Sequence, residues 1–422
     1  MATALDRTFA SLRVPNYRKF FAGQVVSWTG TWVQWVAQAW LVLQITDSAL
    51  GLGLVTALQW LPVLLFGAWA GVIVDRFEKR RLLIFTNVTS GLLSLVLGVV
   101  TVAGAVSLWF VVLIALLLGL VTALDNPARQ TFTMEMVGRD RLANAVSLNT
   151  ATFTTARVMG PALAGFLIAG VGIGECFLLN ALSVVPVTLA LLSMNKQELD
   201  PTAIVEQSKG QLREGLRYVA HHPVLKPLLI MMAVIGTLQY NFQVVLPLLA
   251  KHTFGGDAKT FGLMGAILGI GMFTGSLTSA TFGRSSRGVL VGAGFALGSM
   301  SLLLSLAPNL VVAMPLMIPL GAASMWFIAT MNSTLQLSSS DAMRGRVMAL
   351  YFVLFLGSTP IGAPIIGFVA ETFSPRAALA LGASASICAC IYGLRRLPWL
   401  EGHGATGDAE TSEGEEPVLQ AG

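Results

Sequence analysis

Charged residues are scarce in this chain of 422 residues, since only 11% are Asp, Glu, Lys or Arg. Hydrophobic residues make up 55% of the sequence, and the mean hydropathy is +0.74. A typical soluble protein carries about 25% charged residues, so this chain has too few of them to cover a water-facing surface. The composition excludes an ordinary soluble protein and predicts that the lipid bilayer surrounds much of the molecule.

Residues that build metal centres, disulfides and catalytic sites are also rare. The chain has three cysteines and four histidines without metal-ligand spacing, so we expect no disulfide framework, metal or other cofactor. It lacks the GxxxxGK[ST] phosphate loop, which argues against ATP-driven transport by this chain alone. No nucleophile–base pair lies within the apolar segments, so we do not expect an enzyme. The net charge of +5 sits in short loops between apolar runs and does not indicate a nucleic-acid partner.

Long apolar stretches take the place of these missing features. A helix needs about 20 mostly apolar residues to cross the hydrocarbon core, and the sequence lacks the alternation of a membrane β-barrel. We therefore predict an all-α membrane protein with twelve transmembrane helices in two six-helix bundles. The expected spans are 20–45, 49–74, 81–104, 107–126, 142–170, 173–194, 225–250, 261–282, 288–307, 310–335, 345–370 and 375–394.

The positions of Lys and Arg predict the orientation of these spans. Of the 26 basic residues, 22 fall in the N-terminal segment, in alternate loops, or near the C-terminal end of the last span. Basic residues concentrate on the cytoplasmic side of membrane proteins. The pattern predicts a multi-pass protein of the inner (plasma) membrane with both termini in the cytoplasm.

The polar interval in the middle divides the chain into two related halves. Shifting the sequence by 202 residues places Gly160 on Gly362 and Gly165 on Gly367, and such internal repeats are typical of transporters. The interval itself contains QLREGLRYVAHHP, which has the spacing of an interfacial amphipathic helix. The expected organisation is a cytoplasmic segment 1–19, a first bundle 20–194, a central loop 195–224, a second bundle 225–396 and a disordered acidic tail 397–422.

A few polar side chains inside the apolar segments are candidates for a substrate cavity. On the first span, Gln24, Ser27, Thr31, Gln34 and Gln38 follow helical spacing and form one uncharged polar stripe beside several tryptophans. Lipid would penalise such a stripe, so we expect it to face the interior. The alternative for the tryptophans is an interfacial anchor, as fits Trp109, and the alternative for Gln59 and Asn149 is a helix–helix hydrogen bond. The candidate cavity residues are Gln34, Trp35, Gln38, Arg157, Gln239, Gln243, Trp326 and Asn332.

Arg157 is the basic residue that lies in the middle of an expected span rather than at its end. A central arginine costs roughly 2.5–3.5 kcal/mol on insertion scales, so it should face a cavity or a partner, and the alternative is a structural arginine bonded to carbonyl groups. An arginine can neutralise an anionic substrate but does not release a proton at ordinary pH.

Four motifs resemble one known family. The loop Gly71-Val-Ile-Val-Asp75-Arg76-Phe-Glu-Lys-Arg80-Arg81 is similar to the signature loop of the major facilitator superfamily. Asp125-Asn-Pro-Ala-Arg-Gln130 and Leu212-Arg-Glu-Gly-Leu-Arg-Tyr218 resemble its enterobactin-exporter-like branch. Gly160, Pro161 and Gly165 resemble part of an exporter-associated motif of the fifth helix. Glu78, Ala156 and Ser279 depart from the family pattern.

The resemblance implies a cytoplasmic gate made of Asp75, Arg76, Arg80 and Asp125. The Asp75 carboxylate would cap the positive N-terminus of the eleventh helix, and Arg76 or Arg80 would pair with Asp125. The alternative is that these charges only follow the distribution expected of cytoplasmic loops.

The family also implies the function. It predicts a monomeric secondary transporter that exports a small amphipathic molecule, a siderophore or a drug-like compound, by alternating access with protons as the coupling ion. Acidic residues such as Asp125 lie near the expected span ends, so proton coupling follows from the resemblance alone. The alternatives are an uptake transporter and a non-transporting membrane receptor or assembly factor, although the latter would need a soluble domain that the sequence does not contain.

Overall fold

The computed structural model describes residues 9–200, 211–282 and 286–397, and these residues form helices and no strand. The expected tail lies outside them except for Leu397, as do residues 1–8 of the N-terminal segment and residues 201–210 of the central loop. The first half contains η1 (Ala10–Arg13), α2 (Pro15–Thr46), α3 (Ala49–Arg76), α4 (Lys79–Val102), α5 (Leu108–Val137), α6 (Arg139–Gly170) and α7 (Ile173–Leu192). Between the halves lie η2 (Lys196–Glu198) and α8 (Gln211–His221). The second half contains α9 (Leu225–Leu238), α10 (Phe242–Leu248), the π-helical segment η3 (Leu249–Thr253), α11 (Ala258–Phe282), α12 (Arg287–Ser305), α13 (Leu310–Leu337), α14 (Asp341–Leu356), α15 (Thr359–Thr372) and α16 (Pro375–Arg396).

Most of the expected spans are present as long apolar helices. Within the described residues, eleven stretches are long and apolar enough to cross a membrane. One of them combines α9, α10 and η3, and another combines α14 and α15. The helix α2 has 32 residues but is not among the eleven, and it is the helix that carries the polar stripe. A count of twelve spans is therefore not established by apolarity alone.

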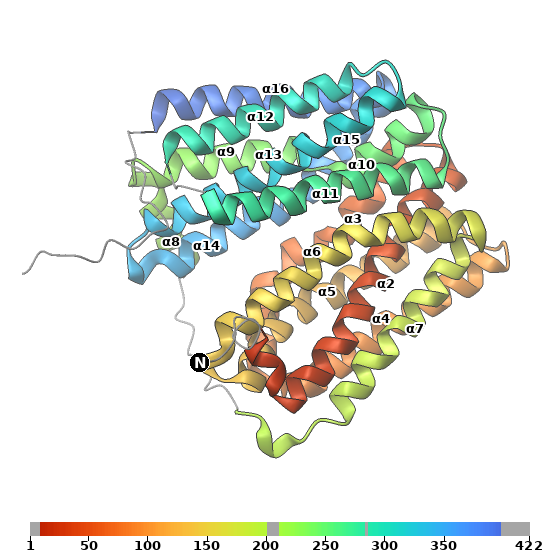
Figure 1. Cartoon of the computed structure of the whole chain (residues 1–422), viewed down its shortest axis with the longest axis vertical. Helices are drawn as coiled ribbons and strands as arrows, with labels where there is room; N and C mark the ends of the chain where they lie inside the picture. The colour runs from red at the N-terminus through yellow and green to blue at the C-terminus, as the bar shows by residue number, and fades with distance from the viewer. Residues whose placement is uncertain (1–8, 201–210, 283–285, 398–422) are drawn as a thin grey trace, which may run out of the picture.

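The helices form two bundles that touch mainly through two helix pairs (Figure 1). In the first bundle, α2 packs against α6 and α7, and α5 packs against α3 and α4. In the second, α12 packs against α13 and α16, and α13 also packs against α11. Between the bundles, α6 lies along α11 and α3 lies along α15. Each half therefore presents its second and fifth long helices to the other half.

The amphipathic segment of the central interval forms α8, which lies on the second bundle. Glu214 of α8 pairs with Arg346 of α14 at 2.7 Å, and Val219 is buried. Leu216 stays about half exposed, so only part of its apolar face packs on the protein.

Glycines make the contact between α6 and α11 close. A Cβ placed on Gly262 of α11 would lie 2.5 Å from the carbonyl oxygen of Pro161 and 2.8 Å from Cα of Gly165. A Cβ on Gly165 would lie 2.9 Å from the carbonyl oxygen of Ala258. Any side chain at these positions would push the helices apart, so this part of the fifth-helix motif is a backbone-to-backbone crossing between the halves.

The second crossing repeats the first with the halves exchanged. A Cβ on Gly367 of α15 would lie 2.6 Å from the carbonyl oxygen of Ala49 in α3. Gly160 packs on Trp32 of its own bundle, and Gly362 packs on Thr237 of its own bundle. The 202-residue repeat of the sequence is therefore also a repeat of contacts.

The two ends of the molecule differ. We call the end where α2 leads into α3 and η3 leads into α11 the closed end, because the halves are joined there by polar contacts. Lys251 of η3 donates to Asp47 at 2.6 Å, and Glu371 of α15 accepts from Ser48 at 2.9 Å.

At the other end, where α3 leads into α4 and α13 leads into α14, the bundles diverge, and we call it the open end (Figure 1). A Cβ on Gly71 of α3 or on Gly345 of α14 would meet nothing within 4 Å, and α3 touches α14 only marginally.

Candidate transport cavity

A cavity of about 230 Å³ lies among the helices of the first bundle. Its walls are largely aromatic: Trp28 stands edge-on to Phe153 at 5.5 Å between ring centroids, and Trp35 stands 6.0 Å from Trp60. The remaining lining is mostly small, polar and uncharged. The lining residues are Ser27, Trp28, Thr31, Trp32, Trp35, Trp60, Thr86, Asn87, Ser90, Val121, Thr122, Asp125, Asn126, Arg129, Phe153 and Val184.

One ion pair supplies the charge in this lining. Arg129 donates from Nε at 2.9 Å and from Nη2 at 2.6 Å to the same oxygen of Asp125, Oδ2. The other oxygen, Oδ1, accepts a 2.7 Å hydrogen bond from the Thr86 hydroxyl. Both oxygens of the carboxylate are thus satisfied, and the spacing of four residues along α5 places the two side chains on one face.

A second partner holds Arg129 from the side of α2. Its Nη1 donates to the side-chain oxygen of Gln24, and its guanidinium lies 5.9 Å from the ring centroid of Phe20. Gln24 is only 1% exposed, and its Nε2 has no hydrogen-bond partner among the described residues. Arg129 therefore bridges α5 and α2 below the aromatic walls.

Asp125 lies deeper than the sequence predicts. The expected fourth span ends at 126, whereas α5 continues to Val137. Val137 is twelve residues beyond Asp125, which corresponds to about 18 Å of helix at about 1.5 Å per residue. The expectation that Asp125 sits at a helix end is wrong, because the polar residues of its motif continue the helix toward the open end.

Arg157 of α6 lies on the other side of Trp32, with its guanidinium 5.7 Å from that ring centroid. Trp32 and Arg157 also line a small cavity of about 80 Å³ between the halves, together with Phe242 and Gln243 of α10. No carboxylate of the described residues lies within ion-pair distance of Arg157. Within the described part of the chain this cation thus has no carboxylate counter-ion, and an anionic group can pair with it at the boundary of the halves.

Sequence comparison gives the family of this bundle architecture. A model of a major-facilitator family, described as transmembrane secretion effector, matches residues 6–417. The chain belongs to the transmembrane secretion effector family. The computed fold agrees: the crystal structure of the nucleoside transporter NupG carrying D323A aligns with a TM-score of 0.73 at 13% identity, over 91% of this chain and 100% of that one.

Relatives of this secretion effector include transporters of siderophores and drugs. The staphyloferrin A transporter of Staphylococcus aureus is 25% identical over 87% of this chain and 93% of its own length. The multidrug efflux pump Tap of Mycolicibacterium fortuitum is 28% identical over 81% of this chain and 86% of its own. The enterobactin exporter EntS of Shigella flexneri is 26% identical over 86% of both. The resemblance found in the motifs is confirmed, and the chain is a multi-pass membrane transporter rather than an enzyme.

The ion pairs expected of the gate are not present in this structure, in which the open end is parted. Arg80 is 7% exposed and donates to the carbonyl oxygens of Leu191 at 2.6 Å and Leu192 at 2.9 Å, where α7 ends. Asp125 pairs with Arg129 instead. The predicted pairing of Asp125 with Arg80 or Arg76 is not made in this structure, where Arg80 stabilises the C-terminus of α7 within its own bundle, and it stays a prediction for the shut state.

Asp75 and Arg76 lie at the open end of α3, where the halves are apart. Among the described side chains no ion pair joins either of them to α14. Their part in a gate stays a prediction for the state in which this end is shut.

Two of the predicted cavity residues instead form hydrogen bonds between helices, each within its own bundle. Gln34 accepts from Ser94 at 2.6 Å and from Asn180 at 2.5 Å, which ties α2 to α4 and α7. Gln239 donates to Ser301 of α12 at 2.5 Å. Both glutamines are at most 3% exposed, so neither lines the cavity described above. Which polar partner each glutamine meets depends on how the helices pack, and helical spacing in the sequence does not reveal it.

The other predicted cavity residues have mixed surroundings. Gln38 donates to Gln59 at 3.1 Å and shares a space of about 20 Å³ with Trp35 and Gln243. In the second bundle, Trp326 donates to Thr278 at 2.8 Å. Asn332 accepts from Gln336 at 2.5 Å. Trp35 thus borders both the large cavity and the space between the halves.

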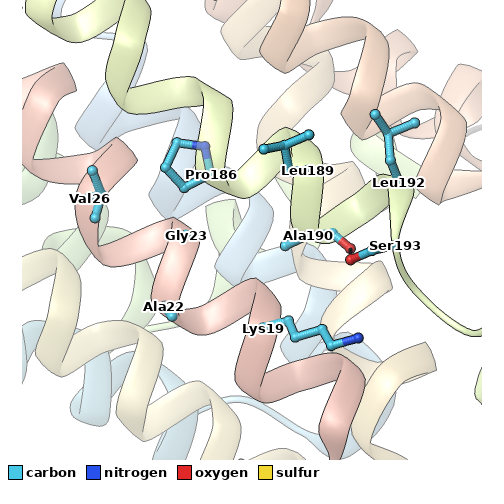
Figure 2. A pocket seen from close by; sticks show the side chains of 9 residues that line it. All are labelled: Lys19, Ala22, Gly23, Val26, Pro186, Leu189, Ala190, Leu192 and Ser193. Atoms are coloured by element: carbon cyan, nitrogen blue, oxygen red, sulfur yellow. Dashed lines mark hydrogen bonds between the residues drawn. The ribbon is translucent and has the colours of Figure 1, made fainter.

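A larger groove lies on the opposite face of α2, and its lining is mostly apolar (Figure 2). It measures about 780 Å³ and runs between α2 and α7, where Val26 and Leu189 line it and Lys19 contributes the one charge. Its α2 positions 22, 23 and 26 point away from positions 24, 28 and 31, which face the ion pair or the aromatic cavity. Its apolar lining suits contact with lipid tails.

Arg129, Thr86 and Trp60 are functional candidates that the sequence reasoning missed. The signal for Arg129 was present, because the DNPARQ motif places an acid and a base four residues apart. Thr86 and Trp60 lie on other helices, and only the packing of α3 and α4 brings them to the cavity.

Proposed function

We propose that this protein exports a small amphipathic molecule, a siderophore or a drug-like compound, across the inner membrane by proton-driven alternating access. One observation carries the proposal: an aromatic cavity with an ion pair at its base occurs in a molecule whose halves touch at one end and part at the other. Such a site can hold a guest in an apolar environment while one face of the membrane is sealed.

The distribution of basic residues supports the orientation in this proposal. Lys79, Arg139, Arg344 and Arg396 all lie at the open end, together with the start of α2 and the end of α16. Basic residues favour the cytoplasmic face. The open end therefore faces the cytoplasm, both termini lie there, and the monomer takes up its cargo from inside.

The two bundles, 20–194 and 225–396, would then rock about the crossings α6–α11 and α3–α15. Closing the cytoplasmic end brings α3 toward α14, where the Asp75 carboxylate can cap the N-terminus of α14. The contacts of Lys251 and Glu371 at the closed end break in the same movement.

The lining of the cavity supports the substrate class. Walls of tryptophan and phenylalanine favour planar or hydrophobic substrates and do not require one particular shape. Arg157 adds a preference for a negative group, and Asp125 with Arg129 offers both signs of charge. Siderophores and drug-like compounds, which the named relatives transport, both fit this chemistry.

Inside-out membrane vesicles test the proposal. Vesicles with the protein and vesicles without it are energised with a pH gradient and given ethidium, Hoechst 33342 or desferri-enterobactin, with and without an uncoupler. We expect accumulation of at least one compound that the uncoupler abolishes. Equal accumulation in both vesicle types for every compound contradicts export of these classes, and accumulation only in right-side-out vesicles would make the protein an importer.

A further inference from the structure

We propose that Asp125 is the carboxylate that binds the exchanged proton. Arg129 is then the partner that holds Asp125 deprotonated in the conformation described above, in which the halves are apart at the open end. This inference rests on the proposed proton-driven transport and names the residue that performs it. The group must meet three conditions: it must lie inside the membrane-spanning part, reach water from the open end, and be stable both with and without the proton.

The depth and exposure of Asp125 meet the first two conditions. It lies about 18 Å of helix from the open end of α5. Its side chain is 18% exposed and that of Arg129 is 13% exposed, both at the edge of the aromatic cavity. Asp125 and Arg129 are the charged residues in the described lining of that cavity.

Thr86 supplies the third condition. Its hydroxyl has one hydrogen but two acceptors within reach, Asp125 Oδ1 at 2.7 Å and the Leu83 carbonyl oxygen at 3.1 Å. With Asp125 ionised, the hydroxyl donates to Oδ1. With a proton on Oδ1, the carboxylic acid donates to the hydroxyl oxygen, and the hydroxyl turns its hydrogen to Leu83. In both states Oδ1 of Asp125 and the Thr86 hydroxyl keep a hydrogen-bond partner, so this part of the site accommodates the carboxylate with and without the proton.

Arg129 can leave Asp125 without losing all its partners. It keeps its contact with the Gln24 oxygen and its place over Phe20. A carboxylate that loses its cation in a partly buried site is strongly disfavoured in its charged form. Separation of the pair and binding of one proton from water at Oδ1 are therefore coupled.

The balance of charge gives the direction of exchange. The ion pair has a net charge of zero; with one proton bound, Asp125 is neutral and Arg129 keeps its charge, so the site carries +1. Facing groups on the neighbouring helices are neutral (Gln24 on α2, Thr86 on α4), apart from Arg157 on α6 beyond Trp32. Proton uptake from outside thus expels a cationic guest, which is the order that antiport requires.

The first test needs no substrate. The chain has nine tryptophans, and four of them, Trp28, Trp32, Trp35 and Trp60, line this cavity. Intrinsic fluorescence of the full chain in lipid nanodiscs is titrated with pH. We expect a one-proton transition in the wild type that is absent in Asp125→Asn and retained in Asp140→Asn, which changes an exposed carboxylate at the start of α6. No transition in the wild type, or an unchanged one in D125N, overturns the proposal.

Thr86→Val separates proton binding from mere packing. The valine fills a similar space but removes the hydrogen bond that Thr86 makes with either form of Asp125. The bond to the ionised carboxylate is the stronger of the two, so its loss favours the protonated form. The transition should move to higher pH by about one unit. A purely structural role would lower the signal without moving its midpoint, and an unmoved midpoint counts against the proposal.

The second test uses ethidium in proteoliposomes. D125N should keep exchange of labelled for unlabelled ethidium, which needs no net proton movement, while accumulation driven by a pH gradient falls at least about tenfold. Loss of both by the folded variant, or retention of both, contradicts the role of Asp125. A wild type that moves ethidium in neither assay contradicts the proposed transport of this probe instead, and the fluorescence result still decides the proton site.

Discussion

The carboxylate of Glu371, near the end of α15, accepts hydrogen bonds from the hydroxyl of Ser48 at 2.9 and 3.1 Å. It also accepts from the backbone N–H of Leu50 at 3.0 Å, so it caps the N-terminus of α3 in the other half. A charge at a helix N-terminus is favourable because it meets unsatisfied N–H groups and the positive end of the helix dipole. The kind of latch that the sequence predicted at Asp75 is thus present at the opposite end of the molecule.

Glu371→Gln should loosen the closed end. The substitution keeps the shape but removes the negative charge from the cap, at a cost of about 1–2 kcal/mol, which is a factor of about 5 to 30 in an equilibrium. Distances between spin labels across the closed end should show more molecules open there. Asp257→Asn is the matched control, because Asp257 caps α11 within its own half through Thr260. If both variants shift the distances equally, the cap does not hold the halves together.

The ion pair of Lys251 with Asp47 should respond to acid and salt. The hydrogen bond and charge of Lys251 lower the pKa of Asp47, so the closed end is favoured by this pair at neutral pH and loses it as pH falls through that lowered pKa. The side chain of Asp47 is 68% exposed and that of Lys251 is 29% exposed, and the Debye length falls from about 10 Å at 0.1 M to about 3 Å at 1 M salt. Lys251→Gln should therefore change the open fraction by less than about fivefold, and 1 M salt should abolish the difference. A difference that persists in high salt would contradict this account.

Gly262→Ala should damage the crossing of α6 with α11. The new methyl group would meet the Pro161 backbone, and overpacking of this kind costs about 1–3 kcal/mol. The midpoint of thermal unfolding should fall, and the spin-label distances across the closed end should broaden. Gly292→Ala in α12 is the control, since its methyl group meets nothing within 4 Å and should be neutral or slightly stabilising. Equal behaviour of the two variants would argue against a close crossing.

Cysteines at Gly71 and Gly345 should report the closing of the open end. Neither position has a neighbour within 4 Å in this structure. The three native cysteines are first replaced. A short bis-maleimide should then join the two new cysteines only in molecules whose open end has shut, and the cross-linked protein should no longer transport. The pair Gly71 with Gly292 serves as a control for random capture. Full transport by cross-linked protein would contradict alternating access.

Arg157→Gln should discriminate between substrates by charge. The arginine lies over Trp32 without a carboxylate partner among the described residues, so an anionic guest would gain a charge-assisted bond there. Loss of a bond of about 1.5 kcal/mol raises the KM for anionic compounds about tenfold, while cationic dyes keep theirs. Arg157→Lys should restore part of the difference. An equal loss for anions and cations would assign Arg157 a structural role.

The sequence predicts the helices well wherever apolarity decides them. The expected span 173–194 corresponds to α7, Ile173–Leu192, and 375–394 corresponds to α16, Pro375–Arg396. It fails for α5, because Asp125 and Arg129 look like the start of a loop when read alone. They continue the helix because each neutralises the other inside the protein. A polar stretch in the sequence therefore does not show where a helix ends, and the position of Asp125 along α5 becomes clear only from the fold.

Partner choice among polar residues is the other part that the sequence does not determine. Gln24, Gln34 and Gln38 lie on one stripe of α2, yet they bond to Arg129, to Ser94 with Asn180, and to Gln59. Helical spacing shows that they share a face, but the neighbours come from four other helices, α3, α4, α5 and α7. The family motif gave the correct helices for Asp125 and Gly165 while leaving their contacts open.

Both crossings between the halves consist of main-chain atoms meeting glycine, and this has a consequence for how such proteins diversify. The close crossings depend on the absence of side chains at Gly165, Gly262 and Gly367, whereas the cavity walls around Trp28 and Trp60 depend on which side chains are present. The walls can therefore be exchanged for new cargo without disturbing the mechanics. The same helix crossings can then serve proteins that share only about a quarter of their residues with this chain. Such proteins handle compounds as unlike as siderophores and drugs.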